Sequence, residues 1–220
     1  GTAGFVCALI LKARFPTKQI TVIHSKKIGI IGVGEGSTEH WNEFMRYIDV
    51  PFQQVIQECD ATFKSGIMFK GWAENDYLHS IGQESQFHNG QYPINYGYLI
   101  SNRVPNKEFN SSFTWENTVA IKYLDDNTTQ APFNQFHFNT NKLNEFLTNL
   151  AVKVNIGVIN DEVLDVKLND DGEIEQLICE NNNYISDFFI DCTGFKRILI
   201  NKLGAKWQSY SKYLKMKSAI

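Results

Sequence analysis

An α/β fold is predicted by three features of this 220-residue chain. A glycine turn, Gly1-Thr2-Ala3-Gly4, precedes an apolar helical run and then a short β-branched strand. Two strands joined by a tight turn follow much later, and a further apolar strand ends in the turn Cys192-Thr193-Gly194. Alternating strands and helices are typical of a mostly parallel sheet covered by helices. Because the two glycine turns lie far apart, we expect one sheet that is interrupted by a long insertion.

The first glycine turn predicts a dinucleotide-binding site. In a complete G-x-G-x-x-G turn, Gly1 takes the second glycine position and Gly4 the third, so we expect the first glycine and its strand before this chain. Backbone N–H groups at the start of the following helix face the pyrophosphate in such turns, and a Cβ would block the approach. A purely structural turn is the alternative, because glycines are common near helix starts.

The helix and strand after this turn are predicted from their apolar residues. Residues 3–15 carry apolar side chains at helical spacing, and residues 20–23 are β-branched, as in a buried parallel strand. His24 and Ser25 stand at the end of that strand, where an acidic residue normally binds the ribose. Since histidine can also donate or accept that hydrogen bond, we interpret both residues as cofactor-binding.

A second glycine-rich segment, residues 28–37, is expected to be a loop. Glycines let the backbone approach a flat or charged ligand, and Ser37 or Thr38 is expected to cap the next helix. Glu35 either hydrogen-bonds a cofactor or catalytic neighbour, or is a solvated charge. A flexible surface loop is the alternative interpretation of the whole segment.

The remaining elements are predicted from hydrophobic periodicity and turn residues. Residues 73–132 are rich in aromatic residues and asparagine and are expected to form irregular loops with short strands. Helices are expected at residues 38–48, 51–57 and 140–151, strands at residues 65–72, 162–168, 173–179 and 188–191, and turns at residues 169–172 and 181–183. The strand at residues 188–191 is expected to be buried.

The wide separation of the nucleotide-binding segments is more typical of FAD enzymes than of NAD dehydrogenases, whose βαβ units follow one another directly. We therefore predict a FAD-binding module at about residues 1–38 and 155–205. The insertion, at about residues 39–154, is expected to carry flavin and substrate contacts.

Composition and charge argue against several classes of protein. The chain is 43% hydrophobic and 20% charged, as in soluble globular proteins, and its net charge of −3 gives no basis for binding nucleic acid or an anionic membrane. No apolar run approaches the roughly 20 residues that span a bilayer. The four cysteines are scattered, which indicates reduced thiols and hence a cytoplasmic protein. The histidines and acids lack metal-ligand spacing, so no metal site is expected.

Several short motifs occur in a fixed order along the whole chain. They are Ile31-Gly32-Val33-Gly34-Glu35, Ala61-Thr62-Phe63-Lys64-Ser65-Gly66-Ile67, Tyr77-Leu78-His79-Ser80-Ile81-Gly82, Phe136-His137-Phe138-Asn139, Asp191-Cys192-Thr193-Gly194-Phe195, Ile198-Leu199-Ile200 and Tyr210-Ser211-Lys212-Tyr213-Leu214. In these motifs the chain resembles the flavin-dependent halogenases of the tryptophan halogenase family. The resemblance covers about the first half of such an enzyme. Family members usually continue with Ala-Thr-Ile-Pro after the glutamate, whereas Gly36-Ser37-Thr38 follows here.

The resemblance implies a FAD-binding Rossmann-like fold of the GR2-type flavin monooxygenases, with insertions and with truncation at both ends. It implies that reduced FAD, supplied by a separate flavin reductase, reacts with O2 and halide to give hypohalous acid. The family's catalytic lysine falls on Lys64, which would deliver the halogen to a small electron-rich aromatic, indole-like substrate. An exposed lysine at a strand end is the alternative for Lys64. A homo-oligomer is a further expectation.

The residues expected to hold FAD come from the glycine turns and from the resemblance. Val163 matches a position whose backbone meets the adenine, although an ordinary core valine is the alternative. The full set is Gly1, Thr2, Ala3, Gly4, His24, Ser25, Gly34, Glu35, Gly36, Ser37, Thr38, Val163 and Gly194. An FAD-dependent aromatic hydroxylase and a non-catalytic flavin-binding protein are the alternative functions.

Overall fold

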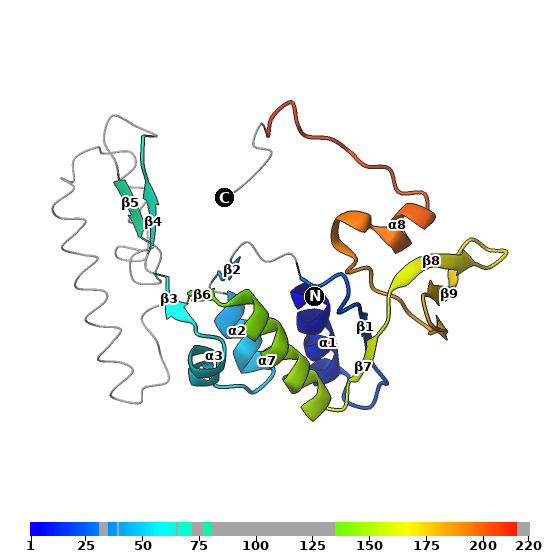
Figure 1. The fold of residues 1–220 in the computed structure, drawn as a ribbon, viewed down its shortest axis with the longest axis horizontal. Coiled ribbons are helices and arrows are strands. Elements are labelled where there is room, and N and C mark those ends of the chain that lie inside the picture. The colour runs from blue at the N-terminus through cyan, green and yellow to red at the C-terminus, as the bar shows by residue number, and fades with distance from the viewer. Residues whose placement is uncertain (31–34, 39, 65, 72–76, 81–134, 215–220) are drawn as a thin grey trace. The chain divides into compact units, whose positions relative to one another are not determined.

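The computed structural model describes residues 1–30, 35–38, 40–64, 66–71, 77–80 and 135–214 (Figure 1). The chain divides into two compact units, and each is described by itself. The first unit combines Gly1–Val33 with Thr140–Ile220, and the second is Gly34–Asn139. The predicted FAD-binding module and insertion have other boundaries. The two units are defined by contacts within the chain and not by cofactor binding, so the predicted division stays a prediction.

In the first unit, two helices and two strands form the start of an α/β fold. Helix α1 (Thr2–Arg14) leads into strand β1 (Thr21–His24), and helix α7 (Thr140–Lys153) leads into strand β7 (Gly157–Asn160). The two strands pair in parallel, and the two helices pack beside each other. These elements confirm the helices and the first strand that the sequence predicted.

The core of this unit is built from the apolar faces of α1 and α7. Phe5, Ala8 and Leu9 are buried on α1. On α7 the buried residues are Thr140, Leu143, Phe146, Leu147, Leu150 and Ala151. The α7 set recurs every three or four residues, which is the spacing that places side chains on one face of a helix.

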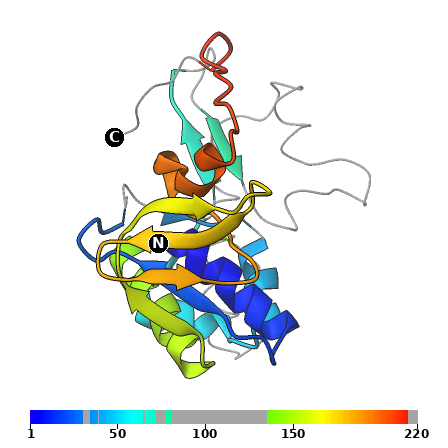
Figure 2. The same cartoon turned by 90° about the vertical axis from the view of Figure 1, so that its right-hand side faces the viewer.

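Three antiparallel strands follow β7 in the order β10-β9-β8 (Figure 2). They are β8 (Val163–Leu168), β9 (Ile174–Cys179) and β10 (Asn183–Ile185). The predicted hairpin between the first two is confirmed. Its turn is closed by Asn169, whose side-chain oxygen accepts hydrogen bonds from the N–H groups of Asp171 and Glu173, and Gly172 has a φ of 81°. The next turn is shorter than expected, because β10 begins at Asn183.

The predicted buried strand at residues 188–191 is wrong. No regular structure covers these residues, and Phe188 and Ile190 are 77% and 45% exposed. A strand exists only where a neighbour accepts and donates its backbone hydrogen bonds, and no strand in the described part of the chain pairs with this segment. The chain continues into a 3-10 turn, η1 (Gly194–Lys196), and helix α8 (Ile198–Lys202).

The second unit contains two short helices and two small sheets. Helices α2 (His40–Tyr47) and α3 (Phe52–Glu58) match the predicted positions. Strands β2 (Glu35–Gly36), β6 (Phe136–Phe138) and β3 (Thr62–Phe63) form one antiparallel sheet with β6 in the centre. Strands β4 (Gly66–Phe69) and β5 (Tyr77–Ser80) form a hairpin.

Of two further predictions for this part of the chain, one is corrected by the structure and the other falls mostly outside the described residues. The loop predicted at residues 28–37 contains β2, because β6 supplies backbone partners, His137 and Phe138, from much further along the chain. The irregular segment predicted at residues 73–132 lies, apart from β5, outside the described residues. None of the helices in the described ranges is long and apolar enough to cross a membrane.

Candidate functional site

The two glycine turns of the first unit lie against each other. A Cβ added to Gly4 would lie 3.6 Å from the Cβ of Cys192, so the first turn of α1 contacts the turn that leads into η1. A Cβ on Gly1 or on Gly194 would have no atom within 4 Å. The fold therefore brings together two segments that the sequence separates, and both present open space at a glycine. Glycine backbone beside a helix N-terminus is suited to phosphate binding.

Asp191 organises the second turn. Its Oδ1 accepts hydrogen bonds from the N–H and the hydroxyl of Thr193, at 2.9 and 2.6 Å. Its Oδ2 accepts from the N–H groups of Leu199 and Ile200, both at 3.1 Å, at the start of α8. Burial acts to raise the pKa of Asp191, but these hydrogen bonds lower it below its usual value. The sequence analysis assigned Asp191 no site role, although an Asp-x-Thr segment before a helix could have indicated a capping carboxylate.

At the end of β1, His24 packs edge-on against Phe5, with ring centroids 5.5 Å apart. Burial lowers the pKa of His24, which favours the neutral imidazole. A neutral ring can both donate and accept a hydrogen bond. The neighbouring Ser25 hydroxyl accepts a hydrogen bond from the N–H of Ile28 at 3.3 Å, so it already closes a local turn.

A buried carboxylate, Asp161, stands beside Val163 at the start of β8. Asp161 is 4% exposed and accepts hydrogen bonds from the N–H of Glu162, from three groups of Asn181 and Asn182, and from the Tyr184 hydroxyl. Burial acts to raise its pKa, and the backbone hydrogen bonds lower it below the usual value. Asp161 thus fixes the turn at residues 181–182 against the start of β8. The sequence analysis missed it, because its partners other than Glu162 lie 20 or more residues away.

In the second unit, the glycine-rich loop is tied to β6. The N–H of Ser37 donates to the carbonyl of Phe136, and the N–H of Phe136 donates back to the Ser37 hydroxyl, both at 2.8 Å. The carbonyl of Thr38, in turn, accepts from the N–H of Trp41 in the first turn of α2. Gly34 lies outside the described residues.

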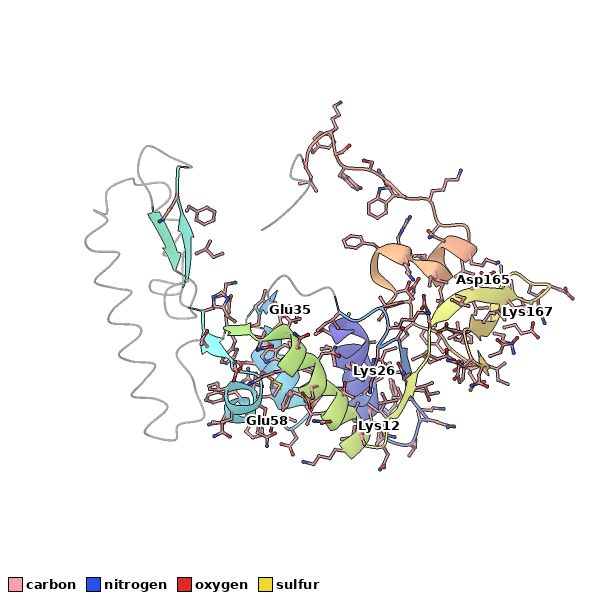
Figure 3. The ribbon with its side chains drawn as sticks, in the orientation of Figure 1. Lys12, Lys26, Glu35, Glu58, Asp165 and Lys167 are labelled. Carbon is pink, nitrogen blue, oxygen red and sulfur yellow. The ribbon has the colours of Figure 1, made fainter. Side chains whose placement is uncertain are left out.

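Glu35 pairs in register with Phe138, and Figure 3 labels its side chain. Its Oε2 is buried and has no hydrogen-bond partner within the described part of the chain. Buried polar atoms are nearly always hydrogen-bonded, so an unsatisfied oxygen calls for a donor from elsewhere. Within the second unit, this orphaned oxygen is compatible with a ligand that carries N–H or O–H donors, as a flavin does. Within the first unit, the open space at Gly1 and Gly194 is compatible with a phosphate group.

Lys64 lies on the same sheet as the glycine-rich loop. Its N–H donates to the carbonyl of Gln135 at 3.0 Å, which extends the β3–β6 pairing by one residue. A Cβ added to Gly36 would lie 3.7 Å from Cδ of Lys64 and 3.7 Å from Nδ1 of His137. Lys64 is half-buried, and no carboxylate of the described residues lies within ion-pair distance of its amine. The strand β6 therefore places Lys64 beside Gly36.

The parallel pair β1–β7 and the helices α1 and α7 belong to an α/β fold of the FAD-binding, Rossmann-like class, as the sequence predicted. The family model for tryptophan halogenase matches residues 1–220, and the chain belongs to this family. The resemblance stated from the motifs is confirmed. Within the described ranges, no three His, Cys, Asp or Glu residues gather as metal ligands would.

The chain is similar to curated enzymes of the same family. It is 30% identical to the 7-chloro-L-tryptophan 6-halogenase KtzR of Kutzneria sp. (strain 744), over all of this chain and 48% of that protein. It is 27% identical to the tryptophan 6-halogenase SttH of Streptomyces toxytricini, over all of this chain and 47% of that protein. The crystal structure of SttH superposes with a TM-score of 0.78 at 26% identity, over 98% of this chain and 47% of that one. The chain thus spans about half the length of the relatives it matches.

The structure brings the candidate residues together in two places. In the first unit, Gly4 lies against Cys192, two residues before Gly194, while His24 and Ser25 follow at the end of β1. In the second unit, Gly36 lies beside Lys64. The roles assigned to all of these residues stay predictions.

Proposed function

We propose that the full-length protein is a FAD-dependent halogenase that acts on an electron-rich aromatic, indole-like compound. The observation that carries the proposal is the position of Lys64, whose side chain passes over Gly36 in the glycine-rich loop. The family supports the same activity, since the curated relatives named above halogenate tryptophan or chlorotryptophan. In an aromatic hydroxylase, by contrast, no lysine is needed to carry an oxidising halogen.

When bound, reduced FAD would supply the two electrons with which O2 and a halide ion become hypohalous acid and water. The N–H groups of residues 1–4 at the start of α1 would hold the pyrophosphate, because they lack intrahelical partners. His24 and Ser25 would contact the ribose, and the backbone of Val163 the adenine. Gly194 and the loop of residues 34–38 would contact the flavin.

Lys64 would then hold and direct the halogen. Its amine would donate a hydrogen bond to hypohalous acid, or would exchange one N–H hydrogen for halogen with release of water. In either case the halogen is held at one nitrogen atom and is transferred to a ring carbon, which loses a proton. Holding the halogen at one positioned nitrogen would favour its transfer to the bound ring over reaction elsewhere.

The partners and compartment belong to the same proposal. A separate flavin reductase would supply reduced FAD, and the protein would work in the cytoplasm. The four cysteines Cys7, Cys59, Cys179 and Cys192 are free thiols, which agrees with a reducing compartment. A homo-oligomer stays a prediction.

The test is Lys64→Ala in the full-length protein, with a flavin reductase, an indole substrate and bromide. We expect flavin oxidation to continue while the brominated product, measured by liquid chromatography and mass spectrometry, is lost. Retention of the brominated product would remove Lys64 from the mechanism. A hydroxylated product that forms equally with and without bromide would support the hydroxylase, and failure to bind FAD would support the non-catalytic alternative.

A further inference from the structure

We propose that His137 is a positioning residue for Lys64, and this inference rests on the proposed role of Lys64. The proposal rests on how the central strand β6 pairs with its two neighbouring strands, β2 and β3. His137 lies opposite Gly36 of β2 on one side and opposite Thr62 of β3 on the other. Residues opposite each other on antiparallel strands point to the same face of a sheet.

Lys64 belongs to that same face. It follows Thr62 by two residues along a backbone that stays hydrogen-bonded to β6, and side chains two residues apart in a strand share a face. The other face of β6 is apolar, because Phe136 and Phe138, on either side of His137, are buried. One face of this small sheet is therefore a core face, and the other presents Thr62, His137 and Lys64.

Gly36 shows where the lysine stem runs. Cδ of Lys64 and Nδ1 of His137 each lie 3.7 Å from the point that a Cβ of Gly36 would occupy. The lysine stem thus runs from β3 across β6 towards Gly36 of β2, and the imidazole of His137 approaches the same point. Gly36 has no side chain, and the ring of His137 reaches the point where the stem passes this glycine. Gln135, two residues before His137 and just before β6, lies opposite Lys64 itself, nearer to its backbone.

A lysine side chain has four rotatable bonds and many rotamers, so its amine occupies one place only if its stem is confined. The His137 ring confines the stem from the side of β6. His137 itself lies beside the aliphatic part of Lys64, so it acts on the reaction through the position of the amine. A displaced amine would let hypohalous acid escape while flavin oxidation goes on.

The experiment compares His137→Ala and His137→Gln with wild type in the full-length protein. For His137→Ala we expect kcat for the halogenated product to fall roughly 10- to 100-fold, the scale of a misplaced reacting group. Substrate KM and the rate of flavin oxidation stay unchanged. His137→Gln, which keeps a planar polar group on the sheet, should lie between the two. Tyr47→Ala, which removes an exposed ring at the end of α2, is the control and should change none of these quantities.

A second measurement reads the position of Lys64 without the reaction. Trace acetylation followed by mass spectrometry gives the reactivity of Lys64 relative to exposed Lys26 and Lys153. We expect His137→Ala to raise this ratio several-fold, with an unchanged melting temperature. An unchanged ratio, or product and flavin oxidation that fall by the same factor, would overturn the inference. If wild type makes no halogenated product, the proposed function fails, and the acetylation ratio still decides whether His137 positions Lys64.

Discussion

Ser37 and Phe136 exchange two hydrogen bonds of 2.8 Å, one between their backbones and one from the N–H of Phe136 to the serine hydroxyl. The residues are 99 positions apart in the sequence, and Ser37 is 7% exposed. This pair fastens the glycine-rich loop to the strand that also holds Lys64. The serine hydroxyl thus adds to the backbone pairing of β2 with β6 that holds the loop near Lys64.

Ser37→Ala should loosen this attachment. It leaves the buried N–H of Phe136 without an acceptor, which costs about 1–3 kcal/mol of stability. We also expect weaker FAD binding, because the loop that follows Glu35 loses its anchor. Urea denaturation and flavin fluorescence titration measure the two effects. Ser37→Thr retains the hydroxyl and should preserve both; an unchanged stability of Ser37→Ala would contradict this role.

Gly194→Ala should lower FAD affinity beyond its effect on stability. Gly194 has a φ of 62° and would face open space with a Cβ, so the substitution costs roughly 1–2 kcal/mol of backbone strain. Gly204→Ala is the matched control, since Gly204 has a φ of 83° and equally open surroundings but no predicted ligand role. Equal loss of FAD affinity in the two variants, measured by fluorescence quenching, would show that strain alone is responsible.

Asp191 should make stability depend on acid pH. Its pKa in the folded protein lies below the usual value of 3.8, so its carboxylate stabilises the fold fully above that pH. The contribution is lost as the pH falls through the lower, folded-state pKa. Asp191→Asn should therefore be less stable than wild type at pH 7, and the difference should shrink as the pH drops below about 4. Melting curves between pH 2 and pH 7 test this, and a difference that does not depend on pH would contradict it.

Leu147→Ala should strongly destabilise the first unit. Leu147 is fully buried on α7, and removing a buried leucine side chain costs about 2–5 kcal/mol. Val152→Ala on the same helix is the control, because Val152 is 58% exposed and should change stability by less than about 0.5 kcal/mol. Denaturant titrations of both variants provide the comparison, and similar midpoints would argue against α7 as a core helix.

The elements that sequence could predict are those fixed by local patterns. Helix α7 follows from apolar residues at helical spacing, and the β8–β9 hairpin follows from Asn169 and Gly172 in its turn. Strand β2 and the segment at Phe188 were predicted incorrectly for one shared reason. Whether a short extended segment is a strand depends on a partner elsewhere in the chain, and local sequence does not contain it.

The residues of the candidate site likewise include some that local sequence could predict and others that it could not. Lys64 and the glycine turns were found from motifs, which are contiguous in sequence. The closeness of Lys64, Gly36 and His137 was not, because it follows from the register of β6 with two strands distant in sequence. Asp161 was not identified from the sequence for a similar reason. The N–H groups that donate to its carboxylate belong to Asn181 and Asn182, in a later turn.

The central place of β6 has a consequence for the order in which the protein forms. Ser37 and Lys64 leave the ribosome well before Phe136, and contacts so distant in sequence form late because a long loop must close first. A nascent chain that ends before Phe136 would hold both β2 and β3 without a partner strand. Lys64 thus takes its place beside Gly36 only after synthesis has passed His137.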